Sequence, residues 1–462
     1  MRIVIMGAGS VGSYIASILA EEGHDVLIIE KYSDALEYVL AENDVMGILG
    51  DGTDPELLRE AEVKDADFFI SLADDDEVNI VAGNMAKVLG AKFTIARVRS
   101  PKYEKNNDFM KTFMGIDHFL NPEMLSAREI ELTLGYGMAS SVEAFFKDKV
   151  EMIQFRITKN SNLAGKTLAE LTTSGLLDKL LITVVDRGDN IYIPAGDFRI
   201  NIDDNIHVIG TPHDLRKLYL REFGKETDIN SSLIIGASKI SYYLAENILA
   251  KGYDVKVIEI DEARAREFHH LLPNAIVIHG DGANSTFLAE ENFEDYDSVI
   301  ALTGIDERNV LIGLLAQKTG ISEVITRVDN KDLLRLTGVL DIDITVTPIK
   351  EAANHILRII RSKEDASEFS ISSLYLLEDN KVEAVEFKVL AGSKIIGRPL
   401  SSIKLKDATI IAFIQKAKTE EVITANGRSI IEEDDLVVVI SKHRAFKDID
   451  DILEERWIKI LY

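Results

Sequence analysis

Three glycines near the start of the chain have the spacing of a phosphate-binding loop. They form the pattern G-x-G-x-x-G directly after the apolar run at residues 2–6. In such a loop the first glycine permits a tight turn, the second lets the backbone approach a pyrophosphate, and the third lets helix and strand pack closely. Amide N–H groups at the start of the following helix then attract the phosphates. We therefore expect nucleotide contacts at Gly7, Ala8, Gly9, Ser10, Val11 and Gly12.

A carboxylate follows this loop at a distance typical of a ribose-binding acid. We expect a helix at residues 13–20 and a second strand at 26–29, which ends on Glu30, 18 residues after Gly12. An acid at this position accepts a hydrogen bond from a ribose hydroxyl and favours NAD(H) over NADP(H), although Lys31 beside it weakens that preference. The alternative is a tight glycine turn that binds nothing.

The elements that would position these residues alternate between strands and helices. Short β-rich runs at residues 45–49, 68–72 and 93–98 are separated by helical stretches, which is typical of βαβ units around a parallel sheet. Ligands of such sheets bind beyond the carboxyl ends of the strands. The strand ends therefore add four candidates for nucleotide binding, which are Asp51, Ala73, Asp74 and Arg97.

Charged side chains at these strand ends have more than one interpretation. The guanidinium of Arg97 can meet a phosphate or stack on an adenine, but it can equally form a structural salt bridge with Glu30 or Asp51. The acidic run at residues 74–77 can bind a divalent cation. Acids are also common at a helix N-terminus, where they suit the helix dipole, and we predict no metal site.

The chain contains the same unit twice. The segment at residues 23–30 returns at 252–259, and the motif at 50–52 returns at 280–282. Asn79 and Arg97 return in the same register as Asn309 and Arg327. So many matches in one register indicate a tandem duplication.

The second glycine loop has lost part of the pattern. Ser238 places a side chain where a pyrophosphate would approach, and Ser241 replaces the packing glycine. Because Gly236, Glu259 and Arg327 remain, we keep these three residues as candidates. We expect this second site to bind a nucleotide weakly, in another pose, or not at all.

The predicted fold class is α/β, with a Rossmann-like parallel-sheet domain and a small α+β lobe that each occur twice. After residue 142 short strands dominate, and a polar segment without periodicity separates the two copies. The predicted division is a Rossmann-like domain at 1–121, a crossover helix at 122–140, a small lobe at 141–223, a linker at 224–231, a second Rossmann-like domain at 232–348, a second crossover helix at 349–366 and a second small lobe at 367–453.

Composition restricts both partners and chemistry. The 462 residues carry a net charge of −26, which argues against nucleic acid and against direct adsorption to anionic lipid. The sequence contains no cysteine, so disulfides, thiolate metal sites and cysteine nucleophiles are excluded. Without a membrane-length apolar run or a signal-peptide pattern, we expect a cytoplasmic protein. No motif supplies a catalytic acid–base set, and we predict no catalytic residue.

Together these motifs resemble the TrkA family of Trk system potassium uptake proteins, whose chains contain two RCK (KTN) domains. The resemblance covers essentially the whole chain and rests on the glycine loop, the G-D-G-T motif at 50–53, the A-R-V-R-S-P motif at 96–101 and the duplication. It implies a tetrameric ring at the inner face of the cell membrane, held there by a potassium channel or transporter subunit of the TrkH/TrkG type. It also implies that NAD(H), ATP or ADP gates the pore by changing ring geometry, bound at Gly7 to Val11, Glu30, Ala73, Asp74 and Arg97.

Two other interpretations stay open at this point. An NAD-dependent oxidoreductase would use the small lobe as a substrate pocket, but the decayed second loop and the missing proton donor argue against it. A structural or sensing module with a vestigial site would bind nucleotide only above millimolar concentration.

Overall fold

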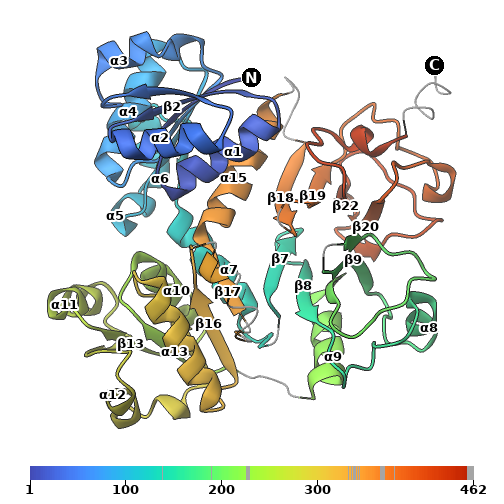
Figure 1. Ribbon diagram of the computed structural model, residues 1–462. Helices are drawn as coiled ribbons and strands as arrows, with labels where there is room; N and C mark the ends of the chain where they lie inside the picture. Colours follow the sequence, from blue (N-terminus) through green and yellow to red (C-terminus); the bar gives the residue numbers. More distant parts are fainter. Residues whose placement is uncertain are drawn as a thin grey trace. The chain divides into compact units, whose positions relative to one another are not determined.

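The computed structural model describes residues 1–137, 139–188, 190–224, 229–330, 332–334, 336, 340, 342, 344–364, 370–378 and 380–454. By its contacts the chain divides into two units (Figure 1). The first comprises Met1–Ala127 and Thr347–Ile356, and the second comprises Arg128–Val346 and Leu357–Tyr462. The centre of the predicted linker, at 225–228, lies outside the described residues.

The first unit is built on a parallel sheet with the strand order β3-β2-β1-β4-β5-β6. This is the doubly wound order, in which a crevice for a ligand opens where the order reverses, between β1 and β4. The strands are β1 (Arg2–Met6), β2 (Asp25–Glu30), β3 (Met46–Leu49), β4 (Phe68–Ser71), β5 (Phe93–Arg97) and β6 (His118–Leu120). The helices are α1 (Ser10–Glu21), α2 (Ser33–Glu42), α3 (Pro55–Glu60), α4 (Asp76–Leu89), α5 (Pro101–Glu104) and α6 (Asn107–Met114). Helix α7 (Pro122–Thr133) begins in this unit and ends in the second.

The second unit contains a sheet of the same order, β14-β13-β12-β15-β16-β17. Its strands are β12 (Ser231–Ile235), β13 (Asp254–Glu259), β14 (Ile276–His279), β15 (Ser298–Ala301), β16 (Glu323–Arg327) and β17 (Ile344–Val346). Its helices are α10 (Lys239–Ala250), α11 (Glu262–Leu271), α12 (Ser285–Glu290) and α13 (Asp306–Lys318). Helix α15 (Pro348–Glu364) begins in the first unit and ends in the second. The two sheets have the same strand order, as expected for two copies of one duplicated unit.

Two antiparallel sheets form the small lobes, with the orders β10-β9-β11-β8-β7 and β18-β19-β22-β20-β21. The first lobe has β7 (Ser141–Phe145), β8 (Val150–Arg156), β9 (Leu181–Arg187), β10 (Asn190–Tyr192), β11 (Asn205–Gly210), α8 (Leu168–Thr173) and α9 (Pro212–Phe223). The second has β18 (Ile371–Leu377), β19 (Val382–Lys388), β20 (Thr409–Gln415), β21 (Val422–Thr424) and β22 (Leu436–Ser441). The predicted fold class is confirmed.

Some element boundaries differ from the sequence-based expectation. Helix α1 begins at Ser10, inside the glycine motif, and not at residue 13 as expected. Gly9 has an extended backbone and is the N-cap of the helix. The predicted division into domains remains our proposal, since the two contact units cut through α7 and α15. No helix among the described residues is long and apolar enough to cross a membrane.

Helix α7 and the loop after it pack on the second Rossmann-like lobe. Glu131 of α7 accepts from Lys251 Nζ at 2.6 Å and from Asn247 Nδ2 at 2.9 Å. Glu323, which is 1% exposed at the start of β16, accepts from the Gly135 N–H at 2.9 Å. Burial raises the pKa of Glu323 to about 8, an effect that this hydrogen bond only partly offsets.

This buried carboxyl predicts a pH-dependent stability. Because the folded chain holds the Glu323 proton more tightly than the unfolded chain does, the stability it contributes is present below the ordinary carboxyl pKa. That stability is lost as the pH rises toward 8. We expect Glu323→Gln to raise the melting temperature at about pH 8.5 and to flatten its decline from about pH 5.5. Calorimetry of both chains, with exposed Glu267→Gln as control, measures this, and identical pH profiles would contradict it.

Candidate functional site

The glycine loop of the first unit is held between the end of β4 and the start of α1. Gly7 has a φ of +106°, a conformation that favours glycine, and a Cβ there would lie 3.1 Å from the Leu72 carbonyl. A Cβ on Gly12 would lie 2.0 Å from the Gly7 carbonyl oxygen. Both glycines are therefore required by the packing of the loop itself.

Gly9 is different because the space above it is open. No atom lies within 4 Å of the position that a Cβ would take, although its φ of −65° suits any residue. Gly9 is also the N-cap of α1, and no side chain caps this helix. The first-turn amides of α1 and the open space together form a cradle suited to a phosphate group.

Glu30 is already oriented by the loop. It is 8% exposed, and its carboxylate accepts from the Ala8 N–H at 2.6 Å and from the Lys31 and Tyr32 N–H groups at 2.8 and 2.9 Å. Each carboxylate oxygen can accept more than one hydrogen bond. A ribose hydroxyl can therefore bind Glu30 without displacing the bonds that hold it.

Arg97 lies at the end of β5 with an incomplete set of partners. Its nearest carboxylates are those of Asp74 at 3.6 Å and Glu123 at 3.5 Å, so the predicted alternatives, Glu30 and Asp51, are not its partners. The side chain is 13% exposed, and its Nε is buried without a hydrogen-bond partner. A buried donor without a partner is costly, which is a reason to expect an anionic ligand here.

Asn79 links the ends of β4 and β5. Asn79 lies in α4 and is fully buried. Its amide oxygen accepts from the Ala73 N–H at 2.8 Å, and its Nδ2 donates to the carbonyls of Ala73 and Arg97 at 2.8 and 3.0 Å. Asn309 repeats these bonds with Thr303 and Arg327. The sequence repeat contained this signal, but the positioning role of Asn79 was not predicted.

The remaining candidates lie at the edge of the cradle. The Thr53 N–H donates to Asp51 and, with the Thr53 hydroxyl, holds the pKa of Asp51 below its usual value, to which Lys31 also contributes. Asp74 is 98% exposed. In the acidic run, Asp76 is buried and accepts from the backbone N–H groups of Arg99 and Ser100. No group of three potential ligands that could hold a metal ion occurs in the described part of the chain.

The second loop replaces the missing glycines with hydrogen bonds. The Ser241 hydroxyl donates to the Gly236 carbonyl at 2.6 Å, and Ser238 caps α10 by accepting from the Ser241 N–H. Glu259 keeps the role of Glu30 by accepting from the Ala237 N–H at 2.7 Å. Arg327 is paired through two nitrogens with Asp329, so its charge is already neutralised.

Comparison with known proteins establishes the family. The TrkA-N domain matches residues 3–122 and 232–348, and the TrkA-C domain matches residues 152–221 and 384–454. The chain belongs to the TrkA family. The TrkA homolog 2 of Methanosarcina mazei is 34% identical over 98% of this chain and all of its own length. The TrkA homolog of Archaeoglobus fulgidus is 32% identical, also over 98% of this chain and all of its own length.

A solved structure shows the same fold. The GsuK channel bound to NAD matches with a TM-score of 0.61 and 16% identity, over 98% of this chain and 78% of that chain. At this identity the likeness concerns the fold alone. It agrees with the TrkA-N and TrkA-C arrangement described above.

The second TrkA-N domain has a pocket with its own basic groups. About 240 Å³ is enclosed by the Gly236 loop, Glu259 and Asp281, together with Arg264 and Arg308. Arg264 lies 3.0 Å from Glu259, and Arg308 lies 3.8 Å from Asp281. The Arg264 side chain is 60% exposed at the start of α11, so it lies at the surface and still reaches Glu259 beside the loop.

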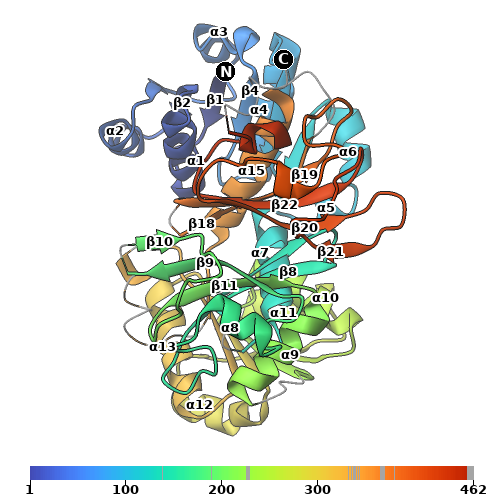
Figure 2. The ribbon, with the colours of Figure 1, turned by 90° about the vertical axis from the view of Figure 1, so that its right-hand side faces the viewer.

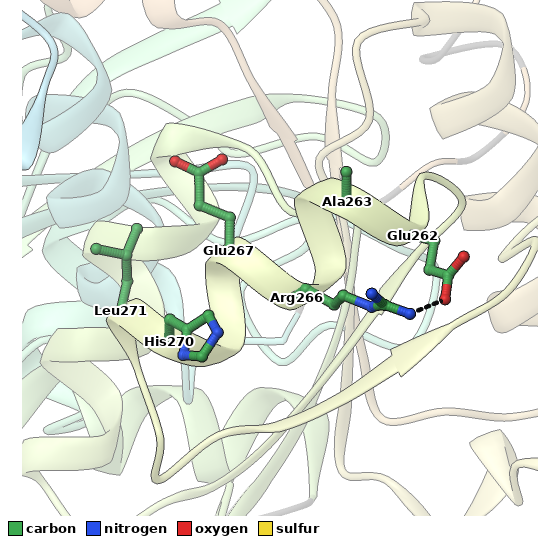
Figure 3. A pocket seen from close by; sticks show the side chains of 6 residues that line it. All are labelled: Glu262, Ala263, Arg266, Glu267, His270 and Leu271. Carbon is green, nitrogen blue, oxygen red and sulfur yellow. Dashed lines mark hydrogen bonds and ion pairs between the residues drawn. The ribbon is translucent and has the colours of Figure 1, made fainter.

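A further hollow on α11 lacks the features of a site. Its lining residues all come from this one helix, where the Arg266 side chain turns to Glu262 and His270 lies beside Leu271 (Figure 3). A binding site normally combines polar groups from several elements. We assign no function to this hollow.

The two glycine positions of the first TrkA-N domain predict opposite outcomes. Gly12→Ala forces a Cβ against the Gly7 carbonyl and should cost about 1–3 kcal/mol of stability, as overpacking does. Gly9→Ala meets no atom and should leave stability unchanged. Thermal unfolding of both variants measures the difference. Equal melting temperatures for the two variants would show that the loop does not pack as described.

Proposed function

We propose that this chain is the nucleotide-binding regulatory subunit of a Trk-type potassium uptake system. The observation that supports this most is the cradle at Gly9, which has open space, uncapped helix amides and the oriented Glu30. The relatives are named Trk system potassium uptake proteins. In our proposal the chain acts at the inner face of the membrane through a potassium-translocating subunit.

We infer that the first site takes NAD(H). A bound NAD(H) supplies a pyrophosphate, ribose hydroxyls and an adenine as groups for recognition. The α1 amides would hold the pyrophosphate, Glu30 a ribose hydroxyl, and Arg97 an anionic or aromatic group at the β5 end. These residues bind and orient the nucleotide, and we assign none of them to hydride transfer.

The second site differs in charge placement, and we infer a different ligand. Ser238 occupies the space that is open over Gly9, while Arg264 and Arg308 bring positive charge to the pocket. These features favour a shorter nucleotide with terminal phosphates, such as ATP or ADP, with the two arginines as phosphate-binding groups. Titration of the chain with NADH and with ATP distinguishes the two sites by their stoichiometry.

Gating in this proposal is a matter of differential affinity. A nucleotide can open a pore only if it binds the open arrangement more tightly than the closed one. A tenfold shift in the equilibrium between the two arrangements requires a difference of about 1.4 kcal/mol in binding free energy. Several sites in one ring add their small differences, so no single site needs a large one.

We propose that the ring forms through an apolar face of the first unit. Phe109 and Phe113 on α6 are 65% and 70% exposed, with their rings stacked 5.6 Å apart. On α4, which Asn84 ties to α6 by a bond to the Met114 carbonyl, Val88 is 79% exposed. Apolar groups gathered in this way indicate an interaction surface.

This face predicts an assembly defect. Phe109→Asp combined with Phe113→Asp should convert a tetramer into smaller species, because two charges would be buried in the interface. Tyr38→Asp, at a 65% exposed aromatic on α2, is the matched control and should keep the assembly intact. Light scattering after size exclusion measures the mass. An unchanged mass for the double variant would place the interface elsewhere.

The function itself is tested by flux. The chain is co-purified with its membrane subunit, and rubidium flux into vesicles is measured with and without NADH. Gly9→Ser copies the second loop into the first, and we expect it to weaken NADH binding at least about tenfold and to remove the NADH effect on flux. Gly196→Ser, at an exposed glycine with open space, is the control.

Two results would contradict the proposed function. Flux that is indifferent to nucleotides in the intact complex would separate the chain from gating. Steady oxidation of NADH with small-molecule substrates would favour the oxidoreductase interpretation instead.

A further inference from the structure

The two antiparallel lobes pack against each other inside the second unit. Phe145, Phe146 and Val184 of the first lobe share one apolar cluster with Phe413 and Val438 of the second. β20 of the second lobe lies next to β9 of the first (Figures 1 and 2). The Tyr375 hydroxyl donates to the Ala144 carbonyl at 2.9 Å across this contact.

A group of titratable side chains interrupts the apolar contact. His207 of β11 is 2% exposed, and its Nε2 lies 2.5 Å from Glu378, which follows β18 in the other lobe. Gln154 Nε2 donates to the same Glu378 oxygen at 2.9 Å. Glu143 on β7 and Asp186 on β9 lie near enough to His207 and Glu378 to interact with their charges. We call Glu143, Asp186, His207 and Glu378 the inter-lobe cluster.

The inter-lobe cluster has more acceptors than donors. Glu143 Oε2, Asp186 Oδ1 and His207 Nδ1 are each buried without a hydrogen-bond partner. The other polar groups that face it are Ser141 toward Glu143, and Asn205 and the Lys381 charge toward Asp186. Three carboxyl groups thus share one imidazole and one lysine in a buried contact. Keeping Glu143 and Asp186 charged beside Glu378 is costly, and protons on these two carboxyl groups relieve that cost.

We propose that the contact between the two lobes is a proton-sensitive joint, in which the carboxyl groups of Glu143 and Asp186 hold protons when the lobes are packed and release them when the lobes separate. The joint closes as the pH falls and loosens as the pH rises. This inference does not depend on the proposed function, because it concerns the lobe contact alone.

The charge balance of the cluster supports this direction. Burial raises the pKa of Glu143 and that of Asp186, and the Glu378 charge adds to both effects. Groups with a raised pKa in the packed state stabilise it below their ordinary pKa, and this stabilisation is lost as the pH rises.

A carboxyl group elsewhere in the lobe contact, that of Glu386, also has a raised pKa. Glu386 of β19 accepts from the Phe146 N–H at 2.7 Å, and burial raises its pKa although Ser372, Ser373 and Arg358 face it. Both halves of the contact therefore weaken in the same direction when the pH rises.

Hydrogen exchange on the full chain tests the joint. Protection of amides at 141–146 and 371–377 is followed from about pH 5.5 to 8.5 and corrected for intrinsic exchange, with amides at 2–6 as internal reference. We expect protection at the joint to fall by up to about tenfold per pH unit for each coupled proton. Glu143→Gln combined with Asp186→Asn should remove most of this slope and keep the joint protected at high pH.

A matched control makes the result decisive. Glu421→Gln combined with Asp197→Asn changes the same residue types at exposed positions and should keep the slope of the unmodified chain. If the double variant does not fold, Glu143→Gln alone should reduce the slope. A joint whose corrected protection does not change with pH, or a cluster variant with an unchanged slope, would overturn the proposal.

Discussion

The close approach of the loop and helix at Gly12 is the constraint on which the first site depends. A side chain there would collide with the Gly7 carbonyl, so the loop keeps its shape only while this position is glycine. That shape places the uncapped start of α1 beside the open space over Gly9. In the second copy a hydrogen bond from Ser241 spans the same place, and Ser238 fills the space. One duplicated scaffold thus carries two sites that differ in shape and charge.

Much of this architecture could be predicted from local patterns. The alternation of strand and helix signals predicted the parallel sheets. The sequence repeat correctly predicted that Asn309 and Arg327 are equivalent to Asn79 and Arg97, because each pair forms the same hydrogen bond in its own copy. Strand β7 was not predicted as a strand, because its residues are only partly apolar, and one of its two buried residues, Phe145, packs in a cluster shared with the other lobe. Contacts between distant segments leave no local pattern. The pairing of Arg97 with Glu123 and the burial of Glu323 against Gly135 are of this kind.

The candidate site, too, could be predicted only in part from the sequence. Glycine spacing and the acid at Glu30 identified the loop, since both follow from backbone geometry. The partner of a long side chain could not be predicted, as the pairing of the exposed Arg264 with Glu259 shows. In our proposal the nucleotide is a ligand whose binding changes the balance between ring arrangements.

We propose that the nucleotide at the Gly9 cradle acts through differential affinity for the free and the membrane-bound chain. The most direct test measures the Kd of NADH for the free chain and for the chain bound to its membrane subunit, under the same salt and pH. We expect the two Kd values to differ, and a tenfold difference would correspond to about 1.4 kcal/mol of gating free energy. Equal Kd values for the free and the bound chain would contradict it.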